Sequence, residues 1–137
     1  MNYKSILIGL IILAILICTW DLVWWILGVK PLLPWRLKGG LKADAEGFTL
    51  IDVRTHAEYE LFHINGAKHR PELMLHPESF RVQDSREPLV VICMTGHRSS
   101  VVAYQLKKRV PQEVYSLTWG MLGWLLSGGE ISKTKSN

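Results

Sequence analysis

The chain of 137 residues is long enough for one ordinary domain and a short additional segment, but not for two domains with separate cores. Its net charge of +4 is scattered, and the longest basic run is Lys107-Lys108-Arg109, which argues against a nucleic-acid partner. The two cysteines, Cys18 and Cys93, lie in segments of different character, so a disulfide framework and a four-cysteine zinc site are both excluded.

An apolar segment near the N-terminus, residues 5–29, carries Asp21 as its only charge. As a helix rising about 1.5 Å per residue it would be roughly 37 Å long, enough to cross the hydrocarbon core of a bilayer. We place Asp21 among the headgroups, with Trp20, Trp24 and Trp25 as an aromatic belt at that interface. A cleaved signal peptide is the alternative, but no small-residue cleavage site follows the apolar run. We therefore predict an uncleaved, single-pass anchor.

Positive side chains are distributed unequally around this segment. Lys4 precedes it, whereas four basic residues follow it closely: Lys30, Arg36, Lys38 and Lys42. By the positive-inside rule, the part of the chain that follows is predicted to lie in the cytoplasm. Prolines in residues 30–37 favour extended backbone, so we interpret this stretch as a short linker.

From Phe48 onward, apolar runs alternate with helical patterns, which is typical of an α/β fold with an open, mostly parallel sheet flanked by helices. Thr55 and Glu58 form a capping box, and Ser99 and Ser100 are expected to cap a later helix. Strands are predicted over residues 48–53, 89–92 and 113–117, and helices over 55–62, 72–76, the stretch after 98, and 121–126.

The loop Cys93-Met94-Thr95-Gly96-His97-Arg98-Ser99 follows the most apolar predicted strand and precedes a helix. Open parallel sheets place their ligands at this position. The loop amides and the helix dipole would favour the thiolate of Cys93, and His97 and Arg98 would add positive charge or hydrogen-bond donors. We therefore predict that Cys93 is a nucleophile at neutral pH, the alternative being a small buried residue at a strand end.

Four motifs in order resemble the rhodanese family of sulfurtransferases, over residues 38–131. They are Leu50-Ile51-Asp52-Val53-Arg54 with Glu58-Tyr59, then His63-Ile64-Asn65-Gly66-Ala67, then Cys93 to Ser99, and finally Gly120-Met121-Leu122-Gly123-Trp124 with Gly128-Gly129. Two positions, Phe62 and Trp119, depart from the family pattern, because the family usually or often has glycine there. The predicted organisation is an anchor over 1–29, a linker over 30–37, a rhodanese-like domain over 38–131 and a disordered tail over 132–137.

The resemblance implies a two-step transfer of sulfur. Cys93 would take a sulfane sulfur from thiosulfate or another persulfide, and its persulfide would pass that sulfur to a thiol, cyanide or a protein. Asp52 and Arg54 resemble residues that brace the loop, and an ordinary structural ion pair is the competing interpretation. We expect His63 to be structural, and we expect neither a cofactor nor a metal, because the histidines have no recognisable ligand spacing.

Two other functions remain open. Cysteine phosphatases and arsenate reductases place five residues between cysteine and arginine, whereas four separate Cys93 from Arg98, which suits a sulfur atom better than a tetrahedral oxyanion. A non-catalytic docking module at the membrane is the second alternative. Since Cys18 is expected in the bilayer, no second cysteine can resolve a Cys93 persulfide, so the acceptor must come from outside the chain. A membrane-associated acceptor protein is a further expectation.

Overall fold

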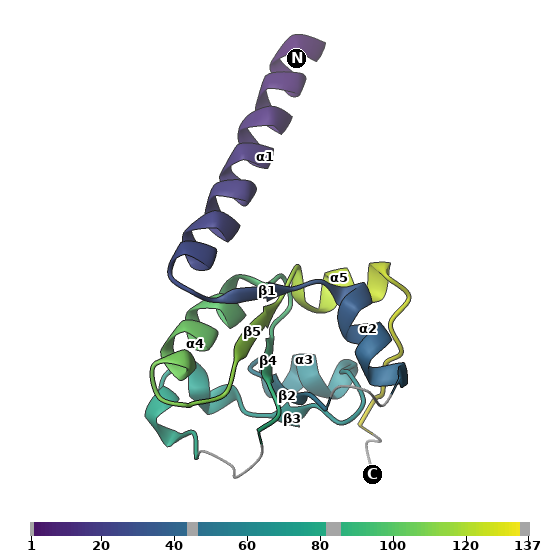
Figure 1. Ribbon diagram of the computed structural model, residues 1–137. Coiled ribbons are helices and arrows are strands. Elements are labelled where there is room, and N and C mark those ends of the chain that lie inside the picture. The colour runs from purple at the N-terminus through teal and green to yellow at the C-terminus, as the bar shows by residue number, and fades with distance from the viewer. Residues whose placement is uncertain (1, 44–46, 82–85, 135–137) are drawn as a thin grey trace.

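The computed structural model describes residues 2–43, 47–81 and 86–134, and it has the predicted α/β architecture (Figure 1). In this part of the chain a parallel sheet has the strand order β1-β5-β4-β2-β3. The strands are β1 (Lys30–Leu32), β2 (Thr49–Asp52), β3 (Lys68–His69), β4 (Leu89–Ile92) and β5 (Val114–Leu117). The fold class predicted from the alternation of apolar runs and helical patterns is confirmed.

Helices cover both faces of the sheet, which explains why β4 is apolar throughout. Side chains alternate across a strand, so Val91 packs on one face against α4 (His97–Lys107), while Val90 and Ile92 pack on the other. That second face is covered by α2 (Pro34–Ala43), α3 (His56–Leu61) and α5 (Gly120–Leu126). Two short 3-10 helices, η1 (Pro71–Met74) and η2 (Pro77–Ser79), connect β3 towards β4. The result is one hydrophobic core on each face of the sheet.

A long helix, α1 (Tyr3–Ile26), projects from the domain (Figure 1). Its 24 residues correspond to about 36 Å at 1.5 Å per residue. Among the described residues it is the one helix that is long and apolar enough to cross a membrane. Most of its large apolar side chains are exposed. Its last turns, in contrast, contact the domain.

The prediction of a linker over residues 30–37 is wrong for their local structure. Lys30–Leu32 form edge strand β1, which pairs in parallel with β5, and the amide of Thr118 donates to the carbonyl of Leu32 over 2.9 Å. Proline is tolerated here because Pro31 lies on an edge strand. Pro34 does not stop a helix but begins α2, since a proline at the first helical position sacrifices no intrahelical hydrogen bond.

Other element boundaries agree more closely with the expectations. The capping box at Thr55 and Glu58 is present at the start of α3. The predicted disordered tail is ordered at its first residue, where Ser132 forms an antiparallel bridge with His63. Of that tail, residues 135–137 lie outside the described residues.

Candidate active site

Cys93 follows the central strand β4 directly, and its side chain is buried. The backbone amide of Gly96 donates to Sγ over 3.0 Å, and the Oγ of Ser99 lies 3.4 Å from Sγ. The sequence suggested that amides from Met94 to Ser99 would converge on the sulfur. Among the recorded contacts, Gly96 supplies the amide that reaches it. The sulfur therefore lies beside a backbone donor and a hydroxyl in a site removed from water.

Ser99 and Ser100 hold the loop in place rather than cap the helix. The helix α4 begins at His97, with Gly96 as its N-cap at a φ of +89°, so the predicted caps at Ser99 and Ser100 are corrected. Their hydroxyls donate back to the carbonyl of Gly96 over 3.1 and 2.9 Å. Both hydroxyls also contact the Oγ of Ser116 on β5, at 2.9 and 3.2 Å. This buried serine cluster fastens the loop to the neighbouring strand.

The start of α5 closes the other side of the loop. The amides of Met121 and Leu122 donate to the carbonyls of Cys93 and Met94 over 2.8 and 3.1 Å. Gly120 permits this approach, because a Cβ there would lie 2.2 Å from the carbonyl oxygen of Cys93. Trp119, just before it, has a φ of 57°, a left-handed conformation that explains why glycine is common at this position in the resembled family.

Phe62, the other departure from the family pattern, does not require a left-handed backbone. Phe62 has a φ of −169°, which is extended backbone that any residue adopts. Its ring lies under the Arg54 guanidinium, at 5.2 Å from ring centroid to Cζ, and its carbonyl accepts from Arg54 over 2.6 Å. A phenylalanine is therefore accommodated without backbone strain.

Arg98 is held by a carboxylate on α3. Its guanidinium donates to Oε1 and Oε2 of Glu58 over 2.8 and 3.4 Å. The hydrogen bond to Arg98 is the main reason why the pKa of Glu58 falls to about 2, and Thr55 lowers this pKa further. Conversely, Glu58 raises the pKa of Arg98, and the charges of Cys93 and Asp52 act in the same direction. Arg98 thus remains positive within electrostatic reach of the sulfur.

Asp52 and Arg54 form a fully buried ion pair at the end of β2, with Nη2 and Oδ2 2.8 Å apart. Arg54 also donates to the carbonyls of Glu58 and Phe62, over 3.2 and 2.6 Å. The pair therefore fastens the strand to α3 and to the residue that follows it. His63 stacks on Tyr59, and its Nδ1 lies 2.8 Å from the carbonyl oxygen of Tyr59. These contacts hold the ring of His63 against α3.

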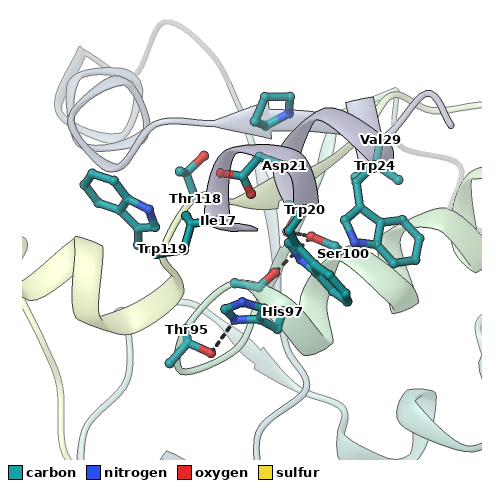
Figure 2. A pocket seen from close by; sticks show the side chains of 13 residues that line it. Ile17, Trp20, Asp21, Trp24, Val29, Thr95, His97, Ser100, Thr118 and Trp119 are labelled. Carbon is teal, nitrogen blue, oxygen red and sulfur yellow. Dashed lines mark hydrogen bonds between the residues drawn. The ribbon is translucent and has the colours of Figure 1, made fainter. Parts of the chain in front are cut away.

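The end of α1 lies against the loop (Figure 2). The ring of Trp20 is 5.2 Å from that of His97, and Asp21 interacts electrostatically with the same histidine. His97 is also hydrogen-bonded to Thr95, with Nδ1 and Oγ1 3.0 Å apart. A pocket between α1 and the loop is lined by Trp20, Asp21, Thr95, His97 and, on its far side, Trp119.

Sequence reasoning missed three contributors to this site. Glu58 was identified as a helix cap, although its carboxylate also pairs with Arg98. Trp20 was assigned to the membrane interface, although it contacts His97. Gly120 was part of a motif without a stated function. The capping box was a usable signal for where Glu58 lies, but no periodicity in α1 indicated a contact with a loop more than seventy positions away.

Comparisons with known proteins identify the family of the chain. The family model of the rhodanese-like domain matches residues 36–127, and the chain belongs to this family. The thiosulfate sulfurtransferase GlpE of Pseudomonas fluorescens (strain Pf-5) is 33% identical over 79 residues, which are 58% of this chain and 72% of that protein. The MOCS3 adenylyltransferase and sulfurtransferase of Drosophila sechellia is 29% identical over 90 residues, and there the chain spans 20% of the relative's length.

Solved structures show the same fold. A thiosulfate sulfurtransferase from Pseudomonas aeruginosa has a TM-score of 0.67 at 23% identity, and the match covers 88% of this chain and 23% of that one. A rhodanese-like domain protein from Staphylococcus aureus has a TM-score of 0.65 at 24% identity, with coverage of 78% and 100%. The resemblance inferred from the four motifs is thereby confirmed as family membership.

Proposed function

We propose that the chain is a membrane-anchored sulfurtransferase that carries sulfane sulfur as a persulfide on Cys93. The observation that carries the proposal is the environment of the thiol: Sγ lies at the end of the central strand, 3.0 Å from the amide of Gly96, with the positive charge of Arg98 within electrostatic reach. Backbone donors and a fixed cation stabilise an anion in a site removed from water. The names of relatives such as the Pseudomonas fluorescens thiosulfate sulfurtransferase support the same reaction class.

The first step is a substitution at sulfur. The Cys93 thiolate attacks the outer sulfur of thiosulfate, a new S–S bond forms, and the original S–S bond breaks so that sulfite leaves with the electron pair. The product is a Cys93 persulfide anion. Its charge is stabilised by the amide of Gly96 and by Arg98, which Glu58 holds in position.

The second step returns the enzyme to its starting state. An acceptor thiolate or cyanide attacks the outer persulfide sulfur, giving the acceptor persulfide or thiocyanate and releasing the Cys93 thiolate. No oxidant or reductant is consumed. With Cys18 in α1 and no further cysteine in the sequence, the acceptor is a separate molecule. Because Cys93 is fully covered, side chains around the loop have to open during each transfer.

We assign α1 as a single-pass membrane anchor and the domain to the cytoplasmic side, with the sulfur donor and acceptor, a membrane-associated protein among the candidates, meeting it there. The length and composition of α1 and the excess of basic residues after it support this arrangement. The anchor would keep a persulfide carrier at one membrane surface.

A turnover assay tests the activity. The full chain in detergent, given thiosulfate and cyanide, should produce thiocyanate, and Cys93→Ser should abolish this production while leaving the circular dichroism spectrum unchanged. A folded chain that makes no thiocyanate from thiosulfate, and none from glutathione persulfide, would refute the enzymatic assignment and favour a docking module on the same fold.

A further inference from the structure

An apolar surface begins at Trp119, on the edge of the pocket beside the active-site loop, and extends over the outer side of α5 and the adjoining part of α2. Met121 and Trp124 are the buried side of α5, whereas the opposite side of the helix is exposed. We call this exposed surface the α5 face. Its members, with their exposed fractions, are Trp35 (54%), Trp119 (52%), Leu122 (47%), Leu125 (40%) and Leu126 (85%).

The α5 face adjoins the last turns of α1, because its member Trp119 lines the same pocket as Trp20 and Asp21 (Figure 2). Figure 1 shows α5 at the top of the domain, on the side from which α1 departs, and β3 at the opposite side. The direction of α1 is set by two aromatic contacts with the domain. Trp20 lies 5.2 Å from His97 and Trp24 lies 5.9 Å from Tyr104, measured between ring centroids. A bilayer crossed by α1 would therefore lie over the α5 face.

Trp119 gives an independent reason to assign a role to this face. A large aromatic residue in the left-handed region is strained relative to glycine, and Trp119 has a φ of 57°. The ring lines the pocket at the end of α1, and about half of its surface is still exposed. Tryptophan is, however, the side chain most suited to the interface between hydrocarbon and headgroups.

Basic side chains of α2 beside the α5 face also suit a membrane surface. Lys38 and Lys42 lie on α2, whose sequence, Pro34–Ala43, contains no acidic residue, and Lys38 donates to the carbonyls of Ser127 and Gly128 at the end of α5 over 3.1 and 2.8 Å. Basic side chains next to exposed aromatic and aliphatic ones are attracted to anionic headgroups while their neighbours enter the interface.

We propose that the α5 face rests on the surface of the bilayer, an inference that depends on the proposed membrane anchor. The active-site loop then lies close to the membrane, because α5 is hydrogen-bonded to it through Leu122 and Met94 and α1 contacts it through Trp20 and His97. Cys93 would exchange sulfur with partners that are themselves presented at the membrane surface.

Two exposed leucines allow a matched test in the full chain. Leu126, on the α5 face, is 85% exposed, and Leu75, in the η1–η2 segment, is 81% exposed. Each is replaced singly by cysteine in a background with Cys18→Ser and Cys93→Ser, labelled with an environment-sensitive fluorophore, and reconstituted into vesicles of phosphatidylcholine and phosphatidylglycerol. Lipids with nitroxide-labelled headgroups and aqueous iodide serve as alternative quenchers, and flotation of the same samples reports the anchor.

The proposal predicts that the label at Leu126→Cys loses most of its fluorescence to the lipid quencher and little to iodide, with the reverse for Leu75→Cys. Equal quenching of both labels by iodide in floating vesicles would overturn it while leaving the anchor intact. A label at Leu126→Cys that is protected from both quenchers would also overturn it, because a second copy of the chain would then cover the face. Protein that fails to float would instead refute the anchor itself.

Discussion

Gly120 is the residue on which the geometry of the sulfur loop depends most directly. In Gly120→Ala the new Cβ would meet backbone atoms of Cys93 and Met94, at 2.2 and 2.8 Å, at a φ of +52°. Because backbone cannot yield as a flexible side chain does, we expect a loss of about 3 kcal/mol or more in the free energy of unfolding. Gly39→Ala is the matched control, since Gly39 lies within α2 and has open space around it.

The control should stabilise the chain by about 0.5–1 kcal/mol, because alanine loses less entropy than glycine in a helix. Denaturant unfolding of both variants in detergent measures the contrast. Equal stabilities for Gly120→Ala and Gly39→Ala would mean that the loop does not pack on α5 as described.

Glu58 connects the start of α3 to Arg98, and its contribution should depend on pH. Its pKa is about 2 in the folded chain, below the ordinary 4.5. A lowered folded pKa means that the stabilisation is complete above about pH 4.5 and is lost as the pH falls towards 2. Glu58→Gln should therefore lower the free energy of unfolding by about 1 kcal/mol at neutral pH, a value that allows for the partial exposure of Glu58. The loss should become smaller as the pH falls through this window.

Thermal unfolding at a series of pH values measures this effect. Glu60→Gln is a suitable control, because Glu60 lies on the same helix and pairs with the exposed ring of His56. A stability difference for Glu58→Gln that does not change with pH would contradict the assigned ion pair.

At the scale of single residues, the features that depend only on neighbours in the sequence could be predicted. Cys93 after an apolar strand and Thr55 with Glu58 as a capping box both follow from neighbours in the chain. The contact of Glu58 with Arg98 does not, because it joins two residues that are brought together by the pairing of β2 with β4.

β1 makes a testable contribution as an element. Leu32 is 7% exposed within the core, whereas a linker residue would be solvated. Leu32→Ala should therefore lower the free energy of unfolding by about 2–3 kcal/mol. Leu61→Ala, at a leucine that is 66% exposed on α3, should change it by less than about 0.5 kcal/mol. Similar small effects for both, measured by denaturant unfolding, would restore the linker interpretation.

The last turns of α1 should affect the active-site loop. Trp20 contacts His97, whereas Trp25 is 62% exposed on the same helix. Trp20→Ala should reduce the rate of thiocyanate formation several-fold by loosening the loop, and Trp20→Phe should recover most of it. Trp25→Ala should have the wild-type rate. If Trp20→Ala and Trp25→Ala are indistinguishable in detergent, α1 acts only as a tether.

Elements with a clear local signal were predicted well: β4 from its apolar run and α3 from its capping box. They were predicted poorly at β1, because a three-residue edge strand with a proline has no period of its own. Its existence depends on β5 offering a partner, which is a tertiary effect that local propensity does not contain. Similarly, α4 begins earlier than the two serines suggested, since Gly96 adopts the left-handed conformation that starts it.

At the scale of the whole molecule, the fold class and the family were predictable because four motifs occur in one order. The arrangement of α1 relative to the domain was not, since its apolar surface would suit a bilayer equally in any orientation. Two aromatic contacts, from Trp20 and Trp24, determine it.

The proposed topology makes one prediction for the whole chain. With the domain in the cytoplasm, protease added to sealed vesicles with their extracellular side outward should leave the C-terminal domain intact, and permeabilised vesicles should lose it. Cleavage before permeabilisation would place the domain on the other side of the membrane and contradict the positive-inside argument.

The central claim is that Cys93 carries sulfane sulfur, and intact mass spectrometry tests it most directly. The full chain is incubated with thiosulfate, its mass is recorded, cyanide is added, and the mass is recorded again, with Cys93→Ser treated in parallel. We predict a gain of one sulfur atom that cyanide removes and that the serine variant lacks. A folded chain that gains no sulfur from thiosulfate or from glutathione persulfide, or a Cys93→Ser variant that gains it equally, would contradict the claim.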